Sequence, residues 1–406
     1  MVYHGVFYIL IKQNKLTVGY YYHIPVYSKN SKVFVPGYLG VFLNALASEV
    51  EVLYLFMHQC NQLQQLDADY ELQQKNIIFV NLGPTSPAWY RHLFHKKILQ
   101  PITPFAEICD ALIIRSPTPL APFFKKYITK PRLFFMVVGD YLEGAKQFKI
   151  KGLRDWIMIQ YLKRNDHLFR QSMRTTDVLV NSPDLLNKYK NISRSIKLIR
   201  TTTLTKNDFF ERTDTCNNNL IEILYTGRIE AAKGLFELVE AVAQLNTNNL
   251  NVQLNIAGWE AGNNKLVEKA LLSKALEFKI DNKVIFHGKK KIGEELNTLY
   301  RKADIYVIPS YHEGFPRTIW EAMANSLPVV ATSVGGIPDY LTHGENALFV
   351  QPKNSNDLAK KIEAIIKDQQ LRSKLIKNGY ALAQTNTIEI QTNNIIKIIE
   401  KLIITK

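Results

Sequence analysis

The feature that most constrains this chain is the regular alternation of short apolar runs with amphipathic stretches in its C-terminal half. The apolar runs are Leu220–Thr226, Val252–Ala257, Lys283–Phe286, Asp304–Ile308 and Pro328–Ala331. Helical patterns lie between them, at Gly234–Leu245, Lys265–Phe278 and Glu294–Lys302. Continuous apolar strands that alternate with helices predict a parallel sheet covered on both faces. We therefore expect a doubly wound α/β domain, with its ligand at the carboxyl ends of the strands.

The N-terminal half shows the same alternation less cleanly. Its predicted strands are Glu51–Phe56, Asn76–Asn81, Ala111–Arg115, Leu133–Val138 and Asp177–Asn181, with helices at Gly40–Ser48 and Arg154–Met173. The fold class is thus α/β, with two Rossmann-like domains facing a central cleft, where a ligand is expected. We place the domains at residues 1–205 and 206–385, joined by a polar linker at Asn207–Asn219. A C-terminal helix, 386–406, is expected to pack back toward the N-terminal domain.

Charge is distributed unevenly along the 406 residues. Residues 1–205 hold 26 Lys and Arg against 13 Asp and Glu, whereas residues 206–406 hold 25 against 23. This asymmetry indicates that the N-terminal half faces an anionic partner such as nucleic acid, anionic lipid or a phosphorylated acceptor. The three cysteines show neither metal-ligand nor disulfide spacing, and the first residues lack the pattern of an export signal. We expect a cytoplasmic protein.

The segment Asp304–Pro352 carries the most specific chemistry. A strand is followed by Glu313-Gly314-Phe315-Pro316-Arg317 and then by a helical run, and proline suits a first helical turn. The free amides of such a turn favour phosphate or other anionic oxygens. Glu313 ends the strand, and Glu321 lies in the helix, where it would accept hydrogen bonds from sugar and ribose hydroxyls. Taken singly, Glu321 is better explained as a solvated helix residue.

A second element lies upstream, where the strand ending at Thr226 runs into a loop and a helix. Arg228 and Lys233 stand in that loop, where two cations would hold a diphosphate. Arginine supplies a fork of donors and lysine a point charge. The alternative for the pair is two ordinary surface cations.

Three segments, GRIEAAKG, EGFPRTIWE and PVVATSVGGIPDYLTHGENALFV, together resemble the nucleotide-sugar-binding domain of glycosyltransferase family 4, the retaining group 1 glycosyltransferases of GT-B fold. The resemblance implies that Arg228 and Lys233 neutralise the donor diphosphate and that Glu313 lies beside the transferred sugar. It implies that Gly314, Phe315, Pro316 and Arg317 line the sugar and phosphate, that Glu321 holds the ribose, and that the loop at Gly288 accommodates the base. It further implies a metal-independent reaction without a cofactor.

The N-terminal half agrees with the family in part. Gly37 and Gly40, before a predicted helix, resemble the loop that approaches the donor phosphates, although a plain turn and helix cap would look the same. Many family members carry a histidine after the central strand of this domain. Here Gly139 and Asp140 follow that strand instead. Asp140 either takes over a sugar or acceptor contact or caps the next element.

Aromatic and basic residues interleave in two N-terminal stretches, Trp89–Lys97 and Lys146–Arg174. Such stretches suit a membrane surface with anionic head groups, and a solvated basic face is the alternative. Peripheral contact with the inner face of the membrane would fit a lipid-linked acceptor.

The expected function is a retaining, hexosyltransferase-like enzyme. It would move a sugar from a UDP- or GDP-sugar to a saccharide acceptor, lipid-linked, in polysaccharide or glycoconjugate biosynthesis. One alternative is a non-catalytic GT-B protein that binds a nucleotide sugar, and another is a different GT-B activity such as epimerisation or phosphorolysis. Nucleic-acid binding is not expected, because no zinc-finger spacing, RNA-binding aromatic signature or basic heptad helix supports it.

Overall fold

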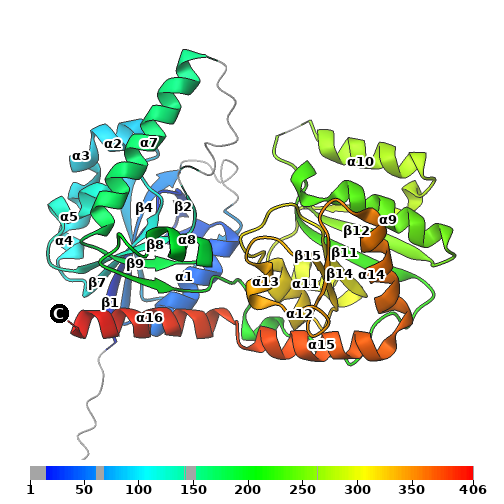
Figure 1. Ribbon diagram of the computed structural model, residues 1–406. Helices are drawn as coiled ribbons and strands as arrows, with labels where there is room; N and C mark the ends of the chain where they lie inside the picture. Colours follow the sequence, from blue (N-terminus) through cyan, green and yellow to red (C-terminus); the bar gives the residue numbers. More distant parts are fainter. Residues whose placement is uncertain (1–14, 61–67, 141, 143–151, 263, 406) are drawn as a thin grey trace, which may run out of the picture.

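The computed structural model describes residues 15–60, 68–140, 142, 152–262 and 264–405, which form two α/β domains (Figure 1). The N-terminal segment and the first part of Lys146–Arg174, which entered the predictions above, lie outside these residues. Each domain is built on a mainly parallel sheet with helices on both faces. The predicted pair of doubly wound domains is therefore confirmed.

The N-terminal sheet has β1 at its centre. Its parallel strands are β1 (Thr17–Tyr21), β4 (Val52–Cys60), β6 (Ile77–Pro84), β7 (Ala111–Ser116), β8 (Arg132–Val137), β9 (Asp177–Val180) and β10 (Ser195–Leu198). They lie in the order β10-β9-β8-β7-β1-β4-β6. A small extension beside β4 is formed by β2 (Val26–Lys29), β3 (Lys32–Val35) and β5 (Tyr70–Glu71). All five predicted strands of this half are present.

The central strand β1 was not among the predicted strands. Gly19 interrupts its apolar pattern, and a glycine inside a strand normally weakens the prediction. In the structure a side chain at this position would lie 2.7 Å from Leu112 and 2.8 Å from Phe56. The glycine therefore makes room for close packing against the sheet, and this reason is visible only in three dimensions.

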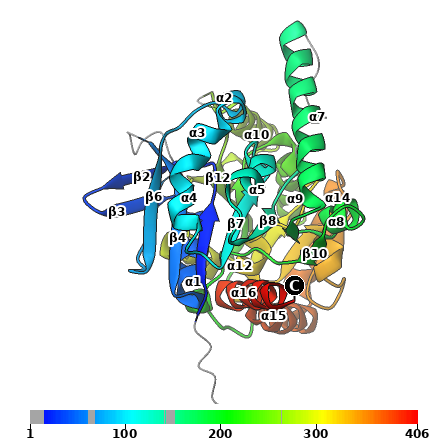
Figure 2. The same ribbon diagram turned by 90° about the vertical axis from the view of Figure 1, so that its left-hand side faces the viewer.

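Helices cover both faces of this sheet. They are α1 (Gly37–Glu49), α2 (Ala88–Leu93), α3 (His95–Leu99), α4 (Thr103–Ala106), α5 (Phe124–Tyr127), α7 (Leu153–Met173) and α8 (Pro183–Tyr189). Phe169 and Met173, near the end of α7, join one buried cluster, and α1 joins the other. The first turns of α7 rise away from the domain (Figure 2).

The C-terminal sheet is wholly parallel, in the order β13-β12-β11-β14-β15-β16. Its strands are β11 (Ile221–Arg228), β12 (Val252–Trp259), β13 (Val284–Gly288), β14 (Ile305–Ile308), β15 (Val329–Thr332) and β16 (Leu348–Val350). Its helices are α9 (Leu235–Thr247), α10 (Leu266–Glu277), α11 (Glu294–Lys302), α12 (Thr318–Ala324), α13 (Ile337–Tyr340), α14 (Ser355–Lys367) and α15 (Gln369–Gln384). Every strand and helix predicted for this domain is found within a few residues of its predicted bounds.

The last helix, α16 (Ile388–Ile404), lies under the N-terminal domain (Figure 1). Ile395, Ile396 and Ile399 join the buried cluster of that domain, and Asn393 donates a hydrogen bond to Glu49 of α1 over 2.7 Å. The chain thus passes between the domains twice. The two passages are bonded to each other, because the Ile388 amide donates to the Leu204 carbonyl over 2.7 Å.

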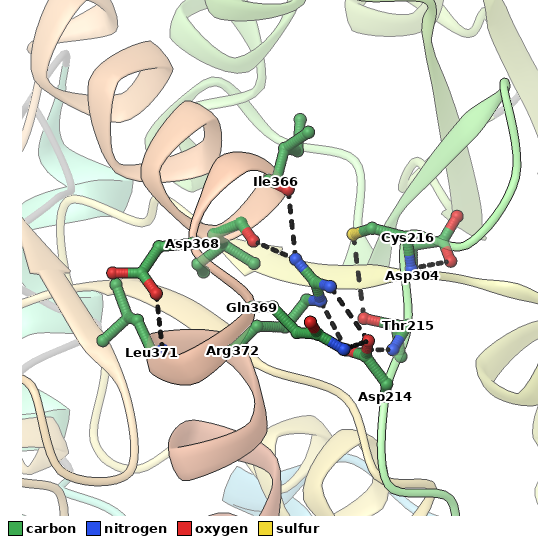
Figure 3. A network of polar contacts seen from close by, with 10 residues as sticks. Asp214, Thr215, Cys216, Asp304, Ile366, Asp368, Gln369, Leu371 and Arg372 are labelled. Carbon is green, nitrogen blue, oxygen red and sulfur yellow. Dashed lines mark hydrogen bonds and ion pairs between the residues drawn. The ribbon is translucent and has the colours of Figure 1, made fainter.

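The linker differs from its prediction. Ile199 belongs to the N-terminal core and Leu204 to the C-terminal core, so the passage is only a few residues long. The polar stretch 207–219 is instead fixed to the C-terminal domain. Arg212 donates to three carbonyls at the end of α11, and Asp214 forms a two-pronged ion pair with Arg372 of α15, at 2.6 and 3.0 Å (Figure 3). Polar composition marked this stretch as a linker, but those polar groups are its anchors.

The Asp214–Arg372 pair is expected to stabilise the C-terminal domain. Arg372 is only 5% exposed, and its guanidinium, with the Thr215 amide, holds the pKa of Asp214 below the ordinary value. Asp214→Asn should lower the free energy of unfolding by about 3 kcal/mol at pH 7, because it leaves a buried cation without its counter-charge. The pair is lost as pH falls through the lowered pKa of Asp214, so the difference should shrink below about pH 4. Urea unfolding of both proteins at pH 7 and below about pH 4 measures this difference.

Glu345→Gln is the matched control. It breaks an ion pair with Lys374 of the same helix α15, but both side chains of that pair are about half exposed. Its expected effect is below about 1 kcal/mol. Equal effects of the two substitutions would contradict a stabilising role for the buried pair.

Candidate active site

The site lies where β11 and β14 meet in the C-terminal sheet. These strands are neighbours at the centre of the sheet, and the chain proceeds from β11 toward β12 and from β14 toward β15, in opposite directions. Such a topological switch point is where parallel α/β sheets bind ligands. Arg228 is the last residue of β11, and the loops that follow β11 and β14 contain the predicted Lys233 and Glu313.

The two loops approach each other closely. Gly234 adopts a left-handed φ of 67°, and a Cβ there would lie 2.1 Å from the Pro309 carbonyl oxygen at the end of β14. The Tyr311 amide donates a hydrogen bond to the Ala232 carbonyl over 2.9 Å. A glycine is therefore needed at this position for both conformation and space, and it fixes the turn that carries Lys233.

Lys233 and Glu313 meet directly. The Lys233 ammonium lies 2.6 Å from Glu313 Oε1, and the two side chains are only 15% and 12% exposed. Arg228 stands at the end of β11, mostly exposed, with its guanidinium 2.8 Å from Glu230. The structure thus unites a cation from the first loop with the carboxylate of the second and leaves the Arg228 guanidinium accessible at the end of β11.

The Glu313-Gly314 turn is held by a pair of glycines after β15. A Cβ on Gly335, whose φ is 54°, would lie 1.6 Å from the Glu313 carbonyl oxygen, and the Gly336 amide donates to the Gly314 carbonyl over 2.6 Å. This glycine pair lies in the third of the segments that resemble family 4, but no role was predicted for it. Two consecutive glycines directly after a buried strand were the available signal for a close backbone approach.

The residues that follow take distinct positions. The Phe315 ring stacks on Trp320 at 4.6 Å and meets Tyr340 edge-on at 4.8 Å, so it supports the loop from inside. Pro316 precedes α12, whose first residue is Thr318. Among the described atoms, none accepts a hydrogen bond from the amides of Gly314 or Arg317. These amides are therefore available to a ligand.

Arg317 reaches toward the N-terminal domain. Its guanidinium lies 5.3 Å from the ring centre of Tyr38, in the first turn of α1. Burial lowers the pKa of Arg317, and the nearby Arg115 adds to the effect, while Glu321 opposes it. Sequence reasoning assigned Arg317 a backbone contact and did not identify Tyr38 as its neighbour across the domains.

Glu321 is buried at 8% exposure, so it is not a solvated helix residue. Its Oε1 accepts a hydrogen bond from Thr203 over 2.7 Å, and its Oε2 accepts one from Tyr300 over 2.9 Å. Thr203 lies in the first passage between the domains. The carboxylate therefore ties the interdomain passage to α12 and retains further lone pairs for a ligand.

Gly288 ends β13 with a left-handed φ of 67°, and nothing lies within 4 Å of a Cβ built there. The neighbouring Lys289 ammonium lies 5.3 Å from the ring centre of Trp259, which ends β12 and is 43% exposed. An open turn beside an exposed aromatic ring is a suitable surface for a planar base.

Gly37 and Gly40 have packing reasons that the sequence did not show. A Cβ on Gly40 would lie 2.2 Å from the Tyr70 ring, and the Gly37 amide donates to Asp69 over 2.9 Å. Gly37 also faces Ile292 of the C-terminal domain. The Gly37 amide is therefore engaged within the N-terminal domain in this structure, although the turn itself lies against the other domain.

Asp140 is engaged by protein groups. It forms an ion pair with Lys188 of α8, and its Oδ1 accepts a hydrogen bond from the Leu142 amide over 2.9 Å. Burial alone would raise the pKa of Asp140, but Lys188 and the Leu142 amide hold it below the ordinary value. The capping contact considered for Asp140 is present in the structure, and the sugar or acceptor contact stays a prediction.

Comparison with known proteins identifies the domain that carries these loops. Residues 206–382 match the family model described as glycosyl transferases group 1. These residues form a group 1 glycosyl transferase domain. An uncharacterized glycosyltransferase of Methanocaldococcus jannaschii is 32% identical over 180 residues, 43% of this chain and 44% of that protein. The capsular polysaccharide biosynthesis glycosyltransferase CapM of Staphylococcus aureus is 28% identical over 305 residues, 71% of this chain and 72% of that protein.

Solved structures share the arrangement of both domains. A glycosyltransferase from Rickettsia africae superposes with a TM-score of 0.70 at 18% identity, over 97% of this chain and 100% of that one. HepE from Anabaena, solved in complex with UDP, superposes with a TM-score of 0.67 at 18% identity, over 95% and 99% of the chains. At this identity the likeness establishes the fold, GT-B, to which the group 1 domain contributes the C-terminal half.

Gly234→Ala tests the close approach of the two loops. The added methyl group would collide with the Pro309 carbonyl and must adopt a left-handed φ, so the turn that holds Lys233 should shift. We expect the free energy of unfolding, measured by urea denaturation, to fall by several kcal/mol. We also expect nucleotide binding to weaken. Gly262→Ala is the control, because Gly262 is also left-handed, at 91°, but has open space around it. A cost above about 1–2 kcal/mol for Gly262→Ala would show that backbone strain alone explains the result.

Proposed function

We propose that this protein is a glycosyltransferase that moves a sugar from a nucleotide-diphosphate sugar to a saccharide acceptor. The observation that carries the proposal is the meeting of Lys233 and Glu313 at 2.6 Å across the switch point, with Arg228 exposed at the end of β11. The group 1 family of residues 206–382 supports the same activity. CapM is named for capsular polysaccharide biosynthesis, which supports a polysaccharide or glycoconjugate product.

The roles follow from where charge develops in the reaction. Cleavage of the bond between sugar and diphosphate places negative charge on the leaving nucleotide and positive charge on the sugar. Arg228 and Lys233 would stabilise the departing diphosphate, and Lys233 would then share its charge between the phosphate and Glu313. Glu313 would face the sugar, the Gly314 and Arg317 amides would contact sugar and phosphate, and Glu321 would accept from the ribose through its remaining lone pairs.

We further propose that the reaction retains the anomeric configuration and requires no metal ion. The support for metal independence is that two protein cations already stand at the position where a diphosphate would leave. Retention rests on the resemblance to family 4. If no metal is required, the protein should keep full activity after treatment with a chelator. If the configuration is retained, an α-linked donor should give an α-linked product.

We propose a lipid-linked acceptor, presented at the inner face of the cytoplasmic membrane. The support is an apolar and basic surface on the N-terminal domain. Its exposed apolar residues are Trp89, Leu93, Phe94, Leu153, Trp156, Ile157 and Met158. Exposed cations, Lys96, Lys97, Lys163 and Arg164, accompany them on or beside α2 and α7. The two helices are neighbours, because the rings of His92 and Tyr161 lie 6.0 Å apart.

This surface has the composition of a peripheral membrane site. Leu153, Trp156 and Ile157 follow one face of the first turns of α7, where they are 73%, 51% and 54% exposed. Apolar side chains would enter the interface while the cations meet anionic head groups. Within the described residues, no helix has the length and apolarity needed to cross a bilayer.

Lys233→Gln and Glu313→Gln test the proposed chemistry. Each should reduce turnover by about 10²–10³-fold, because each removes an interaction made where charge develops. Calorimetric screening of the unaltered protein against UDP-, GDP- and ADP-sugars should find one nucleotide that binds. UDP-glucose is tested first, because HepE from Anabaena has been solved in complex with UDP-glucose. Turnover is measured as nucleotide release with the binding sugar nucleotide.

Lys265→Gln is the control for these variants, since Lys265 is an exposed cation of the same domain whose ammonium group pairs with Glu268. It should leave turnover unchanged. Binding of a sugar nucleotide without transfer or hydrolysis would favour the alternative, a non-catalytic GT-B protein. Absence of binding to every nucleotide sugar would refute the donor site altogether.

The double substitution Trp156→Ser with Ile157→Ser tests the membrane surface. Each side chain should contribute about 1.5–3 kcal/mol when it is buried in the interface, so partition to vesicles containing phosphatidylglycerol should fall at least tenfold. Co-sedimentation measures it. Trp259→Ser removes an exposed tryptophan from the C-terminal domain and should leave partition unchanged. Equal losses in both variants would place the contact elsewhere.

A further inference from the structure

A group of polar side chains at the carboxyl edge of the N-terminal sheet is not used by the donor site. We call it the basic cluster, and it consists of Tyr21, His23, His58, Arg91, Arg115 and Thr118. Its members come from the ends of β1, β4 and β7 and from α2. Each has at least one buried polar atom without a hydrogen bond of normal geometry to a described atom, although Arg91 and Thr118 lie close enough to Tyr21 to oppose the rise that burial causes in its pKa. Such atoms are costly to bury without a partner, so they indicate a place where a ligand completes the structure.

The two arginines have too few partners for their burial. Arg91 is 9% exposed, and the hydrogen bond recorded for it among the described residues runs to the His23 carbonyl at 3.3 Å. Arg115 donates to the Tyr20 hydroxyl at a long 3.4 Å and otherwise faces the rings of Tyr22 and Tyr38. Neither guanidinium forms an ion pair with a described carboxylate. Each carries five N–H donors, so most of its capacity is unused.

Other buried arginines of this chain show what a structural role requires. Arg212 donates to three carbonyls at the end of α11, and Arg372 donates to both oxygens of Asp214 and to two carbonyls. Arg91 and Arg115 lack a comparable set of carbonyl and carboxylate acceptors among the described residues. The difference within one molecule argues against a structural role for the basic cluster.

The cluster is compact and electropositive. Burial lowers the pKa of His23 to about 4, and the neighbouring Arg91, Arg115 and His58 add to the effect. His23 is therefore neutral at pH 7 and offers hydrogen bonds, while the arginines supply positive charge. His58 is 1% exposed and has no hydrogen bond at either ring nitrogen within the described residues.

The cluster also faces the donor site. Arg115 lies 5.7 Å from the Tyr38 ring centre, and Arg317 of the donor loop lies 5.3 Å from the same ring. Arg115 and Arg317 are close enough for Arg115 to lower the pKa of Arg317. An anion held by the basic cluster would therefore lie across the domain interface from the sugar.

We propose that the basic cluster binds a phosphate-bearing group of the acceptor. This inference rests on the proposed glycosyltransferase function and names the chemical class of its second substrate. Two guanidinium groups with hydroxyl and imidazole donors match a phosphate or diphosphate, which carries more charge and more acceptor oxygens than a single carboxylate. A sugar phosphate and a lipid diphosphate share this chemistry.

The test measures binding of inorganic pyrophosphate to the full chain saturated with UDP, by calorimetry. Saturation occupies the donor diphosphate site, so further binding reports a second site. We expect one pyrophosphate site, weakened at least tenfold by Arg115→Gln and less by Arg115→Lys, which keeps the charge. Lys197→Gln removes an exposed cation of β10 in the same domain, outside every site described above, and should leave binding unchanged. UDP affinity should stay within about twofold in every variant.

The possible results distinguish a failure of the phosphate site from a failure of the proposed glycosyltransferase function. Absence of a pyrophosphate site in UDP-saturated protein, or equal binding by Arg115→Gln, overturns the inference while the donor site stands. Glucuronate binding that depends on Arg115, without pyrophosphate binding, overturns the phosphate class. Failure of UDP, GDP and ADP alike to bind refutes the proposed function instead; if GDP or ADP binds in place of UDP, that nucleotide replaces UDP in the saturated protein. Geranyl diphosphate that binds tighter than pyrophosphate assigns a lipid-linked acceptor, and equal binding assigns a soluble sugar phosphate.

Discussion

The close approach of the β11 and β14 loops is the constraint on which the rest of the C-terminal domain depends. The strand order places these strands side by side at the centre of the sheet, and Gly234 removes the side chain that would separate their loops. Lys233 and Glu313 meet only because of that contact. Gly335 and Gly336 hold the Glu313 turn from its other side in the same way, by allowing backbone to touch backbone.

The connection between the domains depends on the same elements. Glu321 lies one helix after the Glu313 turn, and one of its oxygens accepts from Thr203 in the first interdomain passage. That passage is bonded to the second through Leu204 and Ile388, and α16 then packs on the N-terminal core. Residues that face the donor site are thus in direct contact with the segments that join the domains. The buried Asp214–Arg372 pair anchors the start of the C-terminal domain beside them.

The N-terminal domain supplies a different kind of site. Where Lys233 and Glu313 of the C-terminal loops pair with each other, the basic cluster leaves two guanidinium groups without a described carboxylate. The Lys and Arg of the first 205 residues therefore include two groups of different kind. Exposed cations accompany the apolar surface of α2 and α7, and Arg91 and Arg115 are turned into the domain. A charge count registers both parts alike, although their physical roles differ.

The sequence alone was enough to predict the two parallel sheets and the strand-to-helix loops, whereas the donor-binding roles of Arg228, Lys233, Glu313 and Glu321 stay predictions. It was enough because continuous apolar runs, helical periodicity and glycine-bearing loops are local patterns that report local structure. Only the tertiary structure decided which residues meet. Gly19 marks a tightly packed central strand, the polar stretch 207–219 is an anchor, and Asp140 is paired with Lys188. Tyr21, His58, Arg91 and Arg115 share no motif, because strand order rather than spacing along the chain brings four separate segments to one edge of a sheet.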